Sequence, residues 1–599
     1  MSASFLWRSA TRSLNLWGKR TLLAALGAFL LAFPFLVPVL YLQHLAILIL
    51  MYVALSSSWN LIGGFAGYES FGHIVFFGTG AYTSALLLIH LGWSPLVTAP
   101  LAGLAACLVA FLALPSLRTR GAYFAITTLA LSLVVQLVIY NADPITQGGR
   151  GLFLPLSPWG AEVAKRPFYF AMLLAAAGAV GLSYLVKHSK FGLGLELIRD
   201  DEDKAEVVGI NTVLYKSLAF ILSAFFPGVA GAIHGYYMNY ISPAGAFNIL
   251  ISINILLFAI FGGKGTILGP ILGAVILIPV SQALNMALRT ELHVLLFGVL
   301  LILVILYLPG GLASLFQRPA RAPRSDVEPT PREMLCSPVF PDTAEGSRLP
   351  EGPAHEGVLL SLERVSKRFG GVVALDDCSF AVRQGTITGL IGPNGSGKST
   401  AINVITGCVR LDSGGLFYRG KPFRGLRPHR IKALGIARSF QETRVFPSLS
   451  VLENVLASVS GRAGLALLHP RRTPAEEEKA LRLLDFVGLA PFRDVPAREL
   501  SYGQQKLLEF AAVVMGDPDL ILLDEPAAGV NPVLIERLMN FICYLNRQGK
   551  TFLIVEHDMG VIMKYCNPII VMDAGRKIVE GTPQEIQQDP RVLEAYLGE

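Results

Sequence analysis

Charged residues are scarce in this sequence: Asp, Glu, Lys and Arg make up 16% of its 599 residues. Soluble domains carry about 25%, so an entirely soluble protein is not expected. Hydrophobic residues make up 53%, and the mean hydropathy is +0.53. These values exclude a disordered chain and indicate that a large part of the protein lies in a membrane.

Cysteines and basic clusters are also few. The six cysteines form no CxxC pair, which argues against a disulfide scaffold and a zinc site. The formal net charge is +7, but no run of Lys and Arg with interleaved aromatic residues accompanies it. The basic excess therefore favours cytoplasmic loops of a membrane protein over nucleic-acid binding, and we expect membrane lipid but no nucleic acid as a partner.

Long apolar runs fill the chain up to about residue 316. A run of about 20 apolar residues crosses a bilayer as a helix, and ten such runs are present. Glycine and proline interrupt the last four, of which one could be re-entrant, so we expect an α-helical polytopic domain of about eight to ten spans. The runs begin near Thr21, Leu45, Phe71, Pro95, Gly121, Phe168, Val213, Asn248, Ile267 and Glu291.

Basic residues flank these runs. Those that precede the first run predict a cytoplasmic N-terminus by the positive-inside rule. An even number of spans then places the other basic clusters inside as well. The first run is longer than the core of a signal peptide and has no A-x-A site after it, so we expect a span. The basic residues concerned are Arg8, Arg12, Lys19, Arg20, Arg118, Arg120, Lys187, Lys190 and Lys264.

The composition changes after the apolar half. Residues 317–357 are rich in Pro, Arg, Glu and Ser and have no apolar period, which predicts a flexible linker. Charged residues then return at the density of a soluble protein. We expect a transmembrane domain at 1–316, the linker at 317–357 and a soluble α/β domain at 358–599.

The soluble part contains the sequence GPNGSGKST, which matches the phosphate-binding pattern G-x-x-x-x-G-K-[ST]. A β-branched apolar run precedes it and a segment with helical spacing follows, as the pattern requires. The loop backbone would wrap phosphate oxygens at a helix N-terminus, Lys398 would reach the β- and γ-phosphates, and Ser399 would bind Mg²⁺. The loop residues are Gly392, Pro393, Asn394, Gly395, Ser396, Gly397, Lys398, Ser399 and Thr400.

A second apolar run, LILLDEP, ends in two acids at Asp524 and Glu525. Such a run alone is weak, because strands often end in solvated charge. After a phosphate-binding loop, it predicts that Asp524 holds Mg²⁺ and that Glu525 acts as the general base on the attacking water.

The order of five motifs resembles the ATP-binding cassette: the loop, SFQ at 439–441, LSYGQQK at 500–506, LLDEP, and VEHD at 555–558. The resemblance implies an ABC-type domain in which two cassettes face head to tail. Each ATP would then lie between one loop and the other cassette's Ser501, Gly503 and Gln504. Without the family, LSYGQQ would be an ordinary helix cap with Ser501 at the N-cap.

Three more roles follow from the resemblance alone. Gln441 would touch Mg²⁺ and sense the membrane partner, His557 would contact the γ-phosphate, and Phe369 would stack on adenine, although many cassettes have Tyr there. A lone histidine at the place of His557 would more often have no chemistry. Asn531 stands where many cassettes carry Asp, which leaves the contact of this residue across the interface between two cassettes open.

Finer features resemble the importers of branched-chain amino acids. In the cassette these are LEFA after LSYGQQK, EPAAGVNP and the C-terminal EGTP and VLEAYLGE; in the apolar half they lie at 66–82, 117–130, 145–152 and 261–274. The resemblance implies a permease fused to its ATPase in a bacterial inner membrane, with ATP and Mg²⁺ as cofactors. A solute-binding protein, a second permease and a second ATPase, either another copy or a related partner, would complete the importer.

The charged loop at 195–211 also resembles that permease family, in which it would couple to the cassette near Gln441; a solvated loop is the alternative. Glu69 and His73 lie one helical turn apart and either line a pore or serve packing and the interface. Polar residues within spans, namely Gln136, Asn141 and Asn254, allow the same two interpretations.

Other functions remain possible on the sequence alone. Importers of urea or short amides share the architecture. An ATP-driven exporter and a membrane-anchored ATPase without transport are further alternatives, against which the permease-like stretches and the interrupted spans argue.

Overall fold

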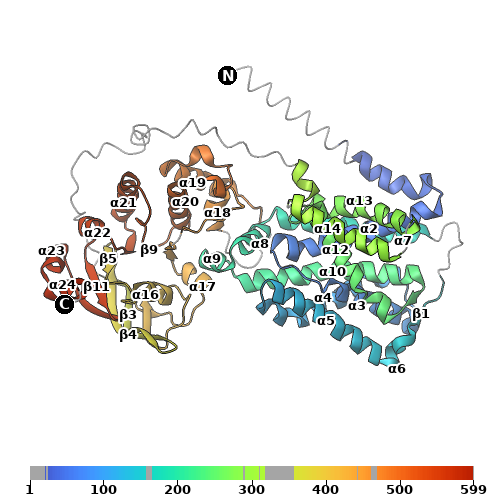
Figure 1. Cartoon of the computed structure of the whole chain (residues 1–599), viewed down its shortest axis with the longest axis horizontal. Coiled ribbons are helices and arrows are strands. Elements are labelled where there is room, and N and C mark those ends of the chain that lie inside the picture. Colours follow the sequence, from blue (N-terminus) through green and yellow to red (C-terminus); the bar gives the residue numbers. More distant parts are fainter. Residues whose placement is uncertain are drawn as a thin grey trace, which may run out of the picture. The chain divides into compact units, whose positions relative to one another are not determined.

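The computed structural model describes residues 21, 24–156, 165–287, 290–308, 310–316, 357–441, 443–459 and 469–597. These form two compact units (Figure 1). The membrane unit comprises described residues up to Lys187 and from Lys216 to Phe316; the cassette unit comprises His188–Tyr215 and those from Gly357 onwards. The predicted linker, except Gly357, and the basic residues before the first span lie outside the described residues.

The membrane unit is helical, as predicted. Among the described residues, eight helices are long and apolar enough to span a membrane, and the shorter apolar helix Ala24–Leu36 precedes them. The predicted tenth run forms α14 (Thr290–Tyr307). The eight candidate spans contain α2 (Leu40–Asn60), α3 (His73–Leu91), α4 (Pro95–Leu112), α5 (Ala122–Asn141), α7 (Lys165–Lys187), α10 (Thr212–Met238), α12 (Ile249–Gly262) and α13 (Leu268–Ala287).

Helix α2 forms the centre of this unit. Its apolar residues are spread over all its sides, and its C-terminal half is continuously buried from Leu50 to Asn60. It begins at Leu40, ahead of the predicted Leu45, and Gln43 is buried because its amide donates hydrogen bonds to the carbonyls of Pro34 and Val37. A helix apolar all round is one enclosed by other helices.

Glycines let α3 and α10 cross closely. A Cβ atom at Gly80 would lie 2.0 Å from the carbonyl oxygen of Gly228, and one at Gly231 would lie 2.0 Å from that of Phe77. Small residues serve such close approach in membrane helices. The two backbones therefore touch where side chains would keep them apart.

Glu69 and His73 do not share a face. Glu69 pairs with Lys264 at 2.9 Å, and both are partly exposed. His73 is fully buried, and its Nε2 lies 3.1 Å from Ser223 Oγ. Asn254 likewise donates to Tyr52 Oη of another helix, at 3.5 Å. These contacts favour the packing and interfacial interpretation.

The cassette unit has an α/β fold, as predicted. Its six-stranded sheet has the order β12-β11-β5-β10-β9-β8, and a four-stranded antiparallel sheet has the order β4-β3-β6-β7. The first sheet contains β5 (Ile387–Ile391), β8 (Ile436–Arg438), β9 (Leu520–Asp524), β10 (Thr551–Val555), β11 (Ile569–Asp573) and β12 (Arg576–Gly581). The second contains β3 (Val358–Phe369), β4 (Val372–Arg383), β6 (Ser413–Tyr418) and β7 (Lys421–Pro422).

Strands β5, β9 and β10 are buried along their whole length and pair in parallel with their neighbours. Continuous apolar runs are typical of parallel strands that are covered on both faces. The helices of this unit are α16 (Lys398–Ile405), α17 (Pro428–Ala433), α18 (Val451–Ala457), α19 (Pro474–Phe486), α20 (Tyr502–Met515), α21 (Pro532–Arg547), α22 (Met559–Tyr565), α23 (Pro583–Gln588) and α24 (Pro590–Leu597).

The charged loop of the sequence folds as two short helices within the cassette unit. Helix α8 spans Lys190–Asp200 and α9 spans Glu202–Val207. The apolar residues Leu195, Leu197 and Ile198 of α8 are buried. Their burial shows that this segment is not a solvated loop.

Candidate nucleotide site and coupling segment

The phosphate-binding loop joins β5 to α16, as its pattern predicts. Gly397 precedes the helix at φ +98°, where a Cβ would lie 2.4 Å from the Ala374 carbonyl oxygen. Lys398 is buried, and its Nζ donates to the carbonyls of Gly392 and Pro393, each at 2.8 Å. Burial lowers the pKa of Lys398, and the charges of Glu525 and Asp524 oppose that shift. The two acids therefore lie within electrostatic range of the loop.

Asp524 ends β9 and is buried. Its Oδ2 pairs with the guanidinium of Arg438 at 3.1 Å, whereas its Oδ1 has no hydrogen-bond partner among the described residues. Burial raises the pKa of Asp524, against the charge of Arg438. A buried carboxylate oxygen without a partner is costly, and a cation bound there would remove the cost.

Glu525, His557 and Gln441 converge at the same edge of the sheet. Glu525 Oε1 lies 2.8 Å from His557 Nε2 and accepts a hydrogen bond from Gln441 Nε2 at 3.2 Å. The three residues follow the neighbouring strands β9, β10 and β8, of which β9 pairs in parallel with both others. Because ends of parallel strands meet at one edge, residues far apart in sequence become neighbours here.

The LSYGQQ residues lie at the start of α20. Ser501 and Gln504 form a capping box with each other: the Ser501 N–H donates to Gln504 Oε1 at 3.0 Å, and the Gln504 N–H to Ser501 Oγ. Gly503 packs against α21, since a Cβ there would lie 2.6 Å from Leu534 Cδ2. Phe369, at the end of β3, is half-exposed, with Lys367 Nζ 5.3 Å from the centre of its ring.

Three charged residues near the site had no predicted role. Besides Arg438, Lys506 Nζ donates to the carbonyls of Gln441 at 3.2 Å and Glu525 at 3.4 Å. Glu509 Oε1 accepts the N–H of Phe440 at 3.0 Å. Both lie in LSYGQQK and LEFA, whose residues indicate a family resemblance but whose spacing does not reveal the backbone groups that these side chains reach.

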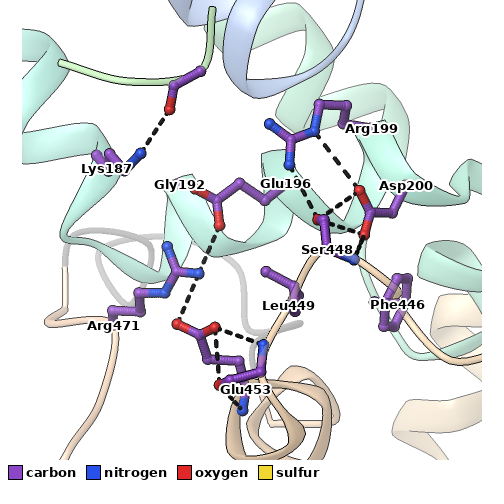
Figure 2. Close-up of polar contacts among 12 residues, drawn as sticks. Lys187, Gly192, Glu196, Arg199, Asp200, Phe446, Ser448, Leu449, Glu453 and Arg471 are labelled. Atoms are coloured by element: carbon purple, nitrogen blue, oxygen red, sulfur yellow. Dashed lines mark hydrogen bonds and ion pairs between the residues drawn. The ribbon is translucent and has the colours of Figure 1, made fainter. Parts of the chain in front are cut away.

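Helix α8 contacts the cassette through a buried ion cluster (Figure 2). Arg471 lies between Glu196 of α8 at 2.6 Å and Glu453 of α18 at 3.1 Å. Burial alone would raise the pKa of Glu453, but Arg471, the Ser450 N–H and a second arginine hold it below its ordinary value. Lys190 Nζ also donates to Glu476 at 2.5 Å. These groups fix α8 by charge at its first residue and near its middle.

The end of α8 contacts the segment that follows Gln441. Ser448 donates to the carboxylate of Asp200 through both its N–H, at 3.1 Å, and its Oγ, at 2.6 Å (Figure 2). Asp201 caps α9 by accepting the N–H of Lys204 at 2.9 Å and lies 3.4 Å from Arg444. Within this unit, the charged segment therefore lies beside the Gln441 segment, which we define as residues 436–441 and 443–449.

Three family models match the chain. Residues 41–305 match "Branched-chain amino acid transport system / permease component", 375–528 match "ABC transporter", and 576–599 match "Branched-chain amino acid ATP-binding cassette transporter". Both halves are therefore matched, each by its own model.

Curated relatives cover the cassette. A probable branched-chain amino acid transport ATP-binding protein LivG from Archaeoglobus fulgidus is 42% identical over 246 residues, which are 40% of this chain and 95% of that protein. LivG from Escherichia coli is 35% identical over 250 residues, 40% of this chain and 98% of that one. The crystal structure of a nucleotide-free cassette from an ABC transporter has 36% identity, covers 40% of this chain and 100% of that one, and has a TM-score of 0.37.

The α/β fold, the motif order and these matches define a multi-pass ABC transporter component with its own ATPase domain. The chain belongs to the branched-chain amino acid ABC transporter family, with permease and ATP-binding domain in one polypeptide. Its cassette is thus an ATP hydrolase coupled to transport.

Proposed function

We propose that this chain imports branched-chain or other hydrophobic amino acids, as half of an ABC importer in the bacterial inner membrane. The observation that supports this most strongly is one polypeptide that matches the permease model over 41–305 and the family's cassette model over 576–599. The N-terminus and the cassette face the cytoplasm in this proposal, as the basic residues of the loops favour.

Hydrolysis takes place at the convergence of Glu525, His557 and Gln441. Glu525 acts as the general base on water. His557 orients the Glu525 carboxylate and contacts the γ-phosphate. The loop Gly392–Thr400 binds the phosphates, with Lys398 supplying positive charge. Phe369 provides the stacking surface for adenine.

Mg²⁺ fits the residues present. The unpartnered Oδ1 of Asp524 is a buried anionic oxygen, and Ser399 and Gln441 add a hydroxyl and an amide oxygen. Oxygen ligands of this kind suit a hard cation. Ser399, Gln441 and Asp524 would hold the ion, which when bound neutralises charge on the β- and γ-phosphates.

A complete importer needs partners. Ser501, Gly503 and Gln504 lie at the start of α20, where the helix dipole favours an anion. They contact the ATP of a second cassette, carried by another copy or a paralogous partner with its own permease. A soluble binding protein outside the membrane delivers the substrate.

Uptake in proteoliposomes tests the proposal. The full-length chain, candidate partner permease and ATPase, and candidate binding proteins are supplied with labelled leucine, phenylalanine or urea. We expect ATP-dependent leucine uptake that requires a binding protein. Uptake of urea alone would show the amide importer instead, and export without any binding protein would exclude an importer.

A further inference from the structure

Side chains of helix α20 bind backbone groups of the Gln441 segment. Lys506 and Glu509 lie one helical turn apart and are both buried. Lys506 donates to the carbonyl of Gln441, and the Glu509 carboxylate accepts the N–H of Phe440. Backbone bonds on either side of Gln441 therefore fix where its side chain lies relative to Glu525.

The α9 helix reaches the same place from the other side. Lys204 is buried, donates to the carbonyl of Arg444 and lies over the Phe446 ring, with Nζ 3.9 Å from its centre. Lys204 thus holds the carbonyl of Arg444, three residues beyond Gln441, while Glu509 holds the N–H of Phe440 just before it. Lys204 and Glu509 also line one pocket together.

Charge couples the two residues. Among the described residues that line this pocket, Lys204, Lys432 and Arg438 are basic and Glu509 alone is acidic. Burial raises the pKa of Glu509, and the charge of Lys204 opposes that rise. Burial lowers the pKa of Lys204 to about 8, and Glu509 is the strongest of the charges that oppose it. Removing either charge leaves the other buried with less compensation from opposite charge, which is costly.

We propose that Glu509 is a positioning residue through which Lys204 of the permease's α8–α9 segment sets the place of Gln441 beside the hydrolytic base. The inference deepens the proposed function, on which it rests in taking α8–α9 as the segment by which the permease acts on its ATPase. It extends the contact beyond the Gln441 segment itself, to the helix that carries the LSYGQQ residues. The proposed series of contacts runs from Lys204 through Glu509, Phe440 and Gln441 to Glu525.

Amide hydrogen exchange of the full-length chain in lipid nanodiscs tests this. The variants are K204M, E509Q, the double variant and K204R, with K190M as the matched control, because Lys190 joins α8 to Glu476 away from the Gln441 segment. We expect K204M and E509Q each to speed exchange of the peptides over 436–449 about three- to tenfold, and the double variant to do no more than either. K204R, which keeps the charge, should retain most of the protection, and K190M should leave these peptides unchanged.

Additive effects of K204M and E509Q would overturn the proposal, because the two residues would then act separately. Equal acceleration in K204R and K204M would overturn it too, since shape rather than charge would matter. E509A is the second variant: if E509Q fails to fold, E509A combined with K204M must show the same non-additivity. The readout contains no substrate, so failure of leucine uptake with intact coupling here would count only against the proposed function.

Discussion

Glu525 and His557 lie side by side, with His557 Nε2 2.8 Å from Glu525 Oε1. Gln441 donates to the same oxygen at 3.2 Å. One carboxylate oxygen is thus shared by two residues from separate segments. A base held in this way is oriented before water arrives.

The first prediction concerns this base. E525Q keeps the size of the side chain but cannot accept a proton, so ATP hydrolysis should fall by about 10²–10⁴-fold while ATP still binds. Phosphate release and nucleotide binding measured on the same preparation check this. Undiminished hydrolysis would show that another group acts as the base.

The second prediction concerns coupling. Reversal of charge across Asp200, Asp201 and Asp203 removes the acceptor for Ser448 and the cap of α9. Uptake should be lost while ATP hydrolysis persists, measured together in proteoliposomes. The matched control reverses the exposed pair of Glu478 and Arg482 and should transport normally. Normal uptake in the triple variant would contradict a coupling role for this segment.

The third prediction concerns the ion cluster around Arg471. R471M leaves Glu196 buried without its cation and leaves Glu453 only Arg472, which should lower the local unfolding free energy of α8 by about 2–5 kcal/mol. R482M breaks an exposed i,i+4 pair and should cost about 0.3–0.5 kcal/mol. Hydrogen exchange of the α8 peptides measures the difference. Equal protection in both variants would mean that the Arg471 cluster does not hold α8.

The fourth prediction concerns pH. Lys432 donates to the carbonyls of Val208 and Ser458, and burial lowers its pKa to about 7. An unfolded lysine keeps its proton up to about pH 10.4, so between these values the unfolded state binds more protons. The free energy of unfolding should therefore rise with pH above 7, by at most about 1.4 kcal/mol per pH unit from this residue.

K432M isolates that contribution. The Tm of the wild type should rise relative to that of K432M from pH 7 to pH 9, because the wild type alone carries the buried charge, whose penalty is fully present below pH 7 and is relieved above it. Parallel curves for the two proteins would show that Lys432 does not titrate in this range.

Much of the fold could be predicted from the sequence, because its signals are local. Apolar runs and the loop pattern mark spans, strands and the P-loop helix without any tertiary information. The start of α2 was missed since Gln43 and His44 interrupt the run, and only the carbonyls of Pro34 and Val37 show how the amide of Gln43 is buried.

Some residues of the candidate site could be predicted from motifs, and others could not. Motifs indicated Glu525, His557 and Gln441, and parallel pairing of β8, β9 and β10 brings them together. Lys506 and Glu509 could not be predicted, because they act on backbone groups of a segment some 65 residues away, as the bond from Lys506 to Gln441 shows. No periodicity records such a contact.

ATP-dependent leucine uptake by K398A tests the central claim most directly. Proteoliposomes with the full-length chain, its partners and a binding protein are compared for the wild type, K398A and the control K421A, whose lysine lies exposed on β7. The account predicts uphill uptake by the wild type and K421A and none by K398A, because Lys398 holds the phosphate-binding loop. Uptake by K398A at the wild-type rate would contradict it.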